Sequence, residues 1–90
     1  MAKCSVELSP RALQDLEKLP ADAARSLLDD IEVLGASPWP GPLKVKKLRG
    51  HELYRLRTRN YRAIFELRGH KVVVLRIVDR QDFERILKTI

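Results

Sequence analysis

Arg55, Arg57 and Arg59 are the residues of this 90-residue chain whose type and spacing are most suited to chemistry. Side chains two positions apart in a strand point to the same side, so these three arginines are expected to line one face of a sheet. Arg62 is expected beside them on the next strand, and Arg80 at the start of the last helix, where free backbone N–H groups attract anions. Because guanidinium groups grip phosphate with two parallel hydrogen bonds, the pattern favours a phosphate site. The alternative is a solvated strand face with cross-strand ion pairs.

The distribution of charge also favours a polyanionic partner. The net charge is +6, yet residues 1–40 hold four basic and seven acidic side chains, whereas residues 41–90 hold fourteen basic and five acidic ones. A basic segment, residues 44–49, contributes Lys46, Lys47 and Arg49. This asymmetry predicts that the second half of the chain builds a surface for a phosphate backbone.

Several classes of function are not expected from this composition. One cysteine and two histidines do not supply a convincing zinc site, and no glycine-rich phosphate loop is present, so neither a metal nor a small-molecule cofactor is expected. No apolar run reaches the roughly 20 residues of a membrane span, and the start of the chain lacks the apolar region of a signal peptide. Together with the lone Cys4, these features predict a cytoplasmic protein, and the length predicts a single domain over residues 1–90.

The hydrophobic pattern predicts an α+β fold in the order β-α-α-β-β-β-β-α. Ser9-Pro10 is a helix-start signal, and Pro20 ends that first helix. The predicted elements are a strand at 3–8, helices at 10–19 and 22–35, a loop at 37–42, strands at 44–48, 53–59, 61–67 and 71–78, and a short C-terminal helix. We expect an antiparallel sheet with the N-terminal helix pair on one face, the helices covering that face and leaving the other face, or part of it, open for function.

Two helices carry predicted core stripes. The second helix has Ala24, Leu27, Leu28, Ile31 and Leu34 at helical spacing. The C-terminal helix has a stripe of Phe83, Ile86, Leu87 and Ile90, with Asp79 as its expected N-cap.

Four segments of the chain resemble the RelE/ParE toxin superfamily. These are residues 47–50 (KLRG), 53–57 (LYRLR), 60–65 (NYRAIF) and 72–82 (VVVLRIVDRQD). The resemblance implies a RelE-like fold and the toxin of a type II toxin–antitoxin pair, held silent by a cognate antitoxin. RelE-like members cut mRNA on the ribosome, with the 2′-hydroxyl as the attacking group, and so inhibit translation. The alternatives are a ParE-like inhibitor of DNA gyrase and a degenerate member that binds only its antitoxin or RNA.

The resemblance assigns roles position by position. Arg62 matches the arginine that holds the scissile phosphate, and Arg80 matches the one that stabilises charge developing on it. Arg55 and Arg57 match the basic pair that follows the family tyrosine, and they complete the expected catalytic set. The expected RNA-binding residues are Lys46, Lys47, Arg49 and Arg59.

The chain departs from the family pattern at two positions. Asp79 stands where the family has histidine, and Glu84 falls where it often has tyrosine, so Phe83 or Tyr61 would have to replace the stacking aromatic. An arginine does not release its proton in proteins, so Arg57 is not a general base. The remaining candidates to accept the proton are Lys46, Lys47, Glu52 and Glu84, unless the ribosome supplies the acceptor.

Overall fold

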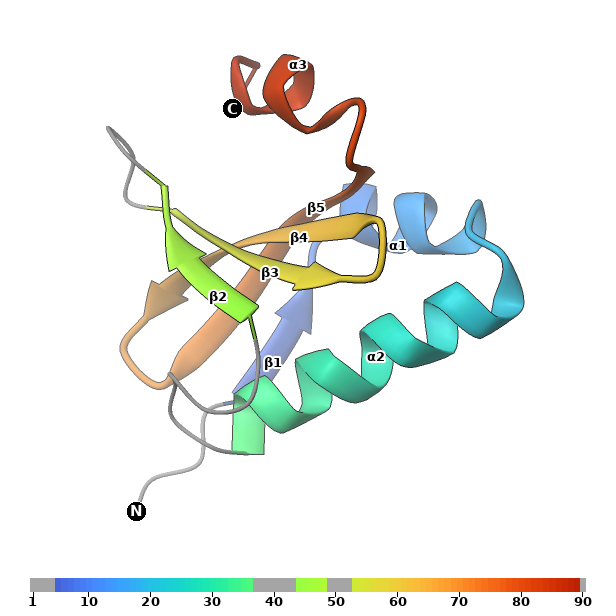
Figure 1. The fold of residues 1–90 in the computed structure, drawn as a ribbon. Coiled ribbons are helices and arrows are strands. Elements are labelled where there is room, and N and C mark those ends of the chain that lie inside the picture. Colours follow the sequence, from blue (N-terminus) through green and yellow to red (C-terminus); the bar gives the residue numbers. More distant parts are fainter. Residues whose placement is uncertain (1–4, 37–43, 49–52, 90) are drawn as a thin grey trace.

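The computed structural model describes residues 5–36, 44–48 and 53–89, and it has the predicted element order (Figure 1). The elements are β1 (Ser5–Leu8), α1 (Pro10–Glu17), α2 (Ala21–Ala36), β2 (Lys44–Lys47), β3 (Tyr54–Thr58), β4 (Tyr61–Arg68), β5 (Lys71–Asp79) and α3 (Phe83–Leu87). None of the helices in these ranges is both long and apolar enough to cross a membrane.

The five strands form one sheet in the order β1-β5-β4-β3-β2. Neighbouring strands are antiparallel except at one edge, where β1 runs parallel to β5. The α+β prediction is therefore confirmed, with the parallel β1 as the one departure from a purely antiparallel sheet. β5 lies between β1 and β4, as predicted for a strand that is apolar on both faces.

The start of α1 is fixed by the predicted cap. The Ser9 hydroxyl oxygen accepts a hydrogen bond from the Ala12 N–H at 3.0 Å, and Pro10 occupies the first turn. The same hydroxyl donates to the carbonyl oxygen of Leu75 at 2.7 Å. The cap thus ties α1 to β5 just beyond the point where β1 ends.

The main core lies between the helix pair and one face of the sheet. Phe65, Leu56 and Val74 are fully buried there against Leu27 and other residues of α2. The stripe predicted for α2 was wrong at Leu28, which is 41% exposed. The buried residues of α2 are Ala23, Leu27, Ile31, Leu34 and Gly35.

A second, smaller core lies on the opposite face of the sheet. It contains Leu48, Leu53, Ile64, Val78 and Ile86. Ile64 reaches this side because side chains alternate along β4, so that its neighbours Ala63 and Phe65 enter the main core. Since Ile86 belongs to α3, that helix covers part of this face, and only the remainder is left open.

The connection from β5 to α3 differs from the prediction. Asp79 ends β5 and accepts a hydrogen bond from the Gln81 N–H at 2.6 Å, so it caps a turn and not the helix. Asp82 stands at the N-cap position of α3 and makes no capping side-chain bond. Three residues therefore separate the strand from the helix, and they swing α3 away from α2 (Figure 1).

Candidate functional site

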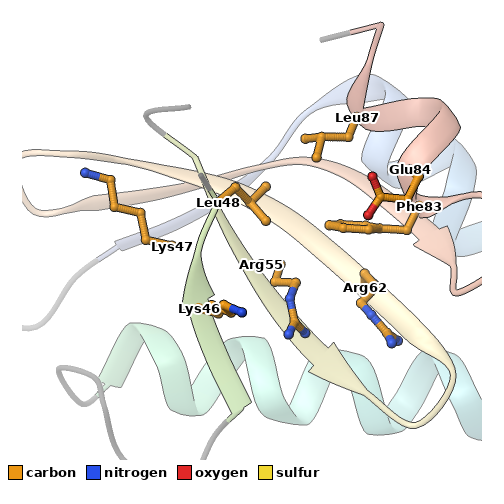
Figure 2. A pocket seen from close by; sticks show the side chains of 8 residues that line it. All are labelled: Lys46, Lys47, Leu48, Arg55, Arg62, Phe83, Glu84 and Leu87. Atoms are coloured by element: carbon orange, nitrogen blue, oxygen red, sulfur yellow. The ribbon is translucent and has the colours of Figure 1, made fainter. Parts of the chain in front are cut away.

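A cavity of about 640 Å³ opens on the sheet face opposite the helix pair, beneath α3 (Figure 2). Strands β2, β3 and β4 supply its basic side chains, and α3 supplies a largely apolar wall. The lining residues are Lys46, Lys47, Leu48, Arg55, Arg62, Phe83, Glu84 and Leu87. Four of the eight residues predicted for catalysis or RNA binding therefore line one cavity.

Strand register explains why these cations meet. Lys46 lies directly opposite Arg55 in the β2–β3 pair, and Arg57 lies directly opposite Arg62 in the β3–β4 pair. Directly opposed residues share a sheet face, and like charges in such positions destabilise a sheet. An anion bound between the strands would offset this repulsion.

The guanidinium of Arg62 is partly buried and lacks a full set of hydrogen-bond partners among the described residues. Its Nη1 atom is buried and has no hydrogen-bond partner among the residues that the structure describes. Burial lowers the pKa of Arg62 from its ordinary value, and the positive charges of Arg55, Arg57 and Arg80 lower it further, against a weaker opposing effect of Asp79. A buried donor without an acceptor destabilises the folded state, so this nitrogen is suited to receive a ligand oxygen as its acceptor.

Arg57 and Arg80 complete the positive field without lining the cavity. Both side chains are exposed, and both lie near enough to Arg62 to depress its pKa. The Arg80 N–H donates to the carbonyl oxygen of Asn60 at 2.8 Å, which fixes the backbone of Arg80 against the β3–β4 turn. Arg80 lies in the turn before α3 and not at the start of the helix, so its contribution comes from its own charge.

Arg59 does not lie with Arg55, Arg57 and Arg62. It adopts a positive φ of 56° in the β3–β4 turn, which breaks the alternation that predicted a shared face with Arg55 and Arg57. Its guanidinium instead pairs with Asp22 of α2, with 3.1 Å between Nη1 and Oδ2. The predicted placement of Arg59 was therefore wrong.

The two remaining predicted RNA-binding residues lie differently. The amino group of Lys47 points away from Arg55 and Arg62, although the residue borders the cavity (Figure 2). Arg49 lies outside the described residues, as does Glu52, one of the candidate proton acceptors.

The α3 wall supplies an aromatic surface. Phe83 is half-buried and packs with Leu87 against the second core, while its ring faces the cavity close to Leu48 (Figure 2). Tyr61, the other candidate for stacking, borders a separate pocket of about 170 Å³ with Asp15 and Arg76. Phe83 is therefore the aromatic that the fold brings to the arginines. The sequence placed Phe83 and Leu87 on an apolar stripe, whereas no sequence signal marked Leu48 as part of this wall.

Glu84 brings the only carboxylate among the described residues that line the cavity. It is exposed, and it forms no ion pair with any residue in the described ranges. No group of three His, Cys, Asp or Glu side chains in the described part of the chain is arranged to hold a metal ion.

The fold and the cavity define a small α+β domain with a basic cavity on the face of the sheet opposite the helix pair. A family model described as the ParE toxin of the type II toxin–antitoxin system parDE matches residues 6–84. A protein of Methanocaldococcus jannaschii named "Putative toxin RelE1" is 30% identical over 83 residues, which cover 89% of this chain and 92% of that protein. The chain belongs to the RelE/ParE superfamily and is the toxin of a type II toxin–antitoxin system.

Solved structures show the same fold. The RelB–RelE antitoxin–toxin complex from Methanococcus jannaschii matches with a TM-score of 0.77 and 24% identity over 89% of this chain and 96% of the matched chain. The archaeal RelE–RelB complex from Pyrococcus horikoshii OT3 matches with a TM-score of 0.75 and 26% identity over 88% and 97%. A mutant of the E. coli toxin RelE in the free state matches with a TM-score of 0.74 and 21% identity over 99% of both chains.

Proposed function

We propose that this toxin stops translation in the cytoplasm by cutting mRNA on the ribosome. The observation that carries the proposal is the buried Nη1 of Arg62, which has no hydrogen-bond partner in the described part of the chain and lies within the field of three further arginines. A phosphodiester would give this nitrogen an acceptor and would relieve the repulsion among the cations at the same time.

The reaction needs positioned positive charge more than it needs a metal ion. When the 2′-hydroxyl of a nucleotide attacks the neighbouring phosphorus, negative charge grows on the phosphoryl oxygens. Arg62 would hold those oxygens, and Arg80 would approach from the turn before α3. Removal of one such donor typically slows a reaction by about 10²–10³-fold.

The wall formed by Phe83, Leu48 and Leu87 supports a nucleic-acid substrate and not a free phosphate. Bases stack on aromatic rings, and such stacking contributes about 1–3 kcal/mol for each base. Phe83 lies beside the arginines, so one nucleotide could place its phosphate on Arg62 and its base on the ring.

A cognate antitoxin is the second proposed partner. Structures that share this fold include RelE bound to RelB, and the net charge of +6 favours a partner with acidic segments. Occupation of the basic cavity by such a segment would exclude RNA.

The test is induction of the toxin alone in a bacterial host, followed within minutes by primer-extension mapping of a reporter mRNA. We expect cuts within translated codons, lost in Arg62→Ala and retained in Arg68→Ala. Arg68 is a matched control because it is an exposed arginine of the same strand that lies outside the cavity and pairs with Glu66. Intact mRNA in arrested cells would overturn the proposal.

Inhibition of gyrase is the second candidate, since the matched family model is that of ParE toxins. It predicts arrested growth with intact mRNA and induction of the DNA-damage response. Normal growth with intact mRNA would instead indicate a member that only binds its antitoxin or RNA.

A further inference from the structure

We propose that Glu84 is the catalytic base that takes the proton from the attacking 2′-hydroxyl, an inference that rests on the proposed cleavage of mRNA. Glu84 occupies the position where the family pattern often has tyrosine, and nothing in the sequence alone separates it from the lysines and Glu52 as an acceptor.

The position of Glu84 in the cavity is the first argument. Its carboxylate lies beside the Phe83 ring, on the α3 side of the cavity, whereas Arg55 and Arg62 extend from the facing strands (Figure 2). A nucleotide whose base stacks on Phe83 would lie next to Glu84, because the two residues are neighbours on α3 and line the same cavity.

The free state of this carboxylate is the second argument. Five ion pairs join described residues, and none of them includes Glu84, although Arg55 and Arg62 line the same cavity. A carboxylate placed only to neutralise the arginines would be paired with one of them. A general base must be able to accept a proton, and a carboxylate that no described cation engages is suited to this role.

The other basic groups of the cavity are less suited to the role. An arginine keeps its proton in proteins, and a lysine must first lose one from an ammonium group whose ordinary pKa is about 10.4. Lys46 lies directly opposite Arg55, where its positive charge serves to attract phosphate. The amino group of Lys47 points away from the arginines (Figure 2).

The proposed step is balanced in atoms and electrons. The 2′-oxygen forms a bond to phosphorus while its proton passes to the Glu84 carboxylate. The bond between phosphorus and the 5′-oxygen of the next nucleotide breaks, and that oxygen leaves with the electron pair and takes a proton from water. Glu84 then returns its proton to the solvent, so the products are a 2′,3′-cyclic phosphate and a free 5′-hydroxyl.

The negative charge of Glu84 predicts a combination of effects on binding and cleavage that a purely structural role would not produce. A carboxylate near the phosphate repels it, so Glu84→Gln should bind RNA as tightly as the unchanged toxin or more tightly, while cleaving it more slowly. A substitution that merely distorted the wall would weaken binding and cleavage together.

The experiment measures single-turnover cleavage by the purified toxin on ribosomes programmed with a defined mRNA. Binding is measured separately, on the same complex with 2′-deoxyribose at the scissile nucleotide. We expect Glu84→Gln to reduce cleavage by about 10²–10⁴-fold with unchanged or tighter binding, and Glu84→Asp to retain more activity than Glu84→Gln. Lys46→Gln should instead weaken binding.

Three results would overturn the proposal, and they differ from one another. Cleavage by Glu84→Gln within threefold of the unchanged toxin would exclude Glu84 as the base and leave the proposed function standing. Parallel loss of binding, or a lowered melting temperature, would assign Glu84 a structural role. Absence of cleavage by the unchanged toxin on programmed ribosomes would overturn the proposed function and, with it, the role of Glu84.

Discussion

Asp15 of α1 holds Arg76 of β5 through two hydrogen bonds, 2.8 Å from Nε to Oδ2 and 3.3 Å from Nη2 to Oδ1. The same carboxylate accepts the Ile77 N–H at 3.0 Å. Because β1 ends at Leu8, opposite Val74, no strand among the described residues pairs with this edge of β5 beyond that point. Asp15 replaces part of the missing strand, and so it couples α1 to the sheet.

Loss of the Asp15 carboxylate should therefore destabilise the whole domain. Both side chains are largely buried, with 13% of Asp15 and 17% of Arg76 exposed. Asp15→Ala leaves a buried guanidinium and an edge N–H unsatisfied, and we expect a loss of about 3 kcal/mol in the free energy of unfolding, measured by urea denaturation. Asp15→Asn keeps an acceptor for Ile77 and should cost less; equal losses in the two variants would contradict this account.

Arg62 should carry out its function at the expense of stability. The folded state keeps a charged guanidinium partly buried among other arginines, so Arg62→Met removes the repulsion while keeping an apolar stem in place. We expect a gain of about 1 kcal/mol in the free energy of unfolding, together with loss of toxicity. Arg68→Met is the control and should change stability by less than about 0.5 kcal/mol. A less stable Arg62→Met variant would show that the charge is satisfied in the fold.

RNA binding should depend on salt in proportion to the number of arginines that contact phosphate. For a single strand, each contact contributes about −0.7 to the slope of log K against log salt concentration. Arg57→Gln is expected to make the slope shallower by about that amount, because Arg57 lies opposite Arg62 at the site. Fluorescence anisotropy with a short single-stranded RNA between about 50 and 200 mM salt measures the slope. A slope unchanged from that of the native toxin would place Arg57 outside the contact surface.

The pairing of Arg59 with Asp22 should appear in the dependence of stability on pH. The hydrogen bond from Arg59, and next that from the Ala23 N–H, lower the pKa of Asp22 from its ordinary value of 3.8. A carboxyl whose pKa is lower in the folded state stabilises the fold above pH 3.8, and this contribution disappears as the pH falls through the lowered pKa. The difference in urea midpoint between the native toxin and Asp22→Asn should therefore shrink as the pH falls below 3.8. Arg59→Ala should show the same trend, and a difference that grew on acidification would contradict the assignment.

Local patterns in the sequence predicted most of the fold. Ser9-Pro10 marked the start of α1, and period-2 alternation placed Arg55 and Arg57 on the face opposite Leu56. Such signals depend on neighbours within a few positions, so they can be recognised without tertiary structure.

The predictions were wrong where distant contacts or turn geometry determine the direction of a side chain or the start of an element. The positive φ of Arg59 reorients its side chain, and the turn after Asp79 delays α3 until Phe83. The bond between Asp15 and Arg76 joins residues 61 positions apart, and no periodicity reveals it. The place of Leu48 in the cavity wall was missed for the same reason, because Leu48 and Phe83 meet only after the sheet has formed.

The alternation along β4 also has a consequence for how the chain folds. Ala63 and Phe65 enter the main core, while Arg62 on the same strand faces the cavity. A shift of one residue in strand pairing would exchange the two sets and bury the guanidinium of Arg62 in the main core. Arg62 thereby raises the free energy of misregistered strand pairing. It favours the native alignment of β4 already in the free protein.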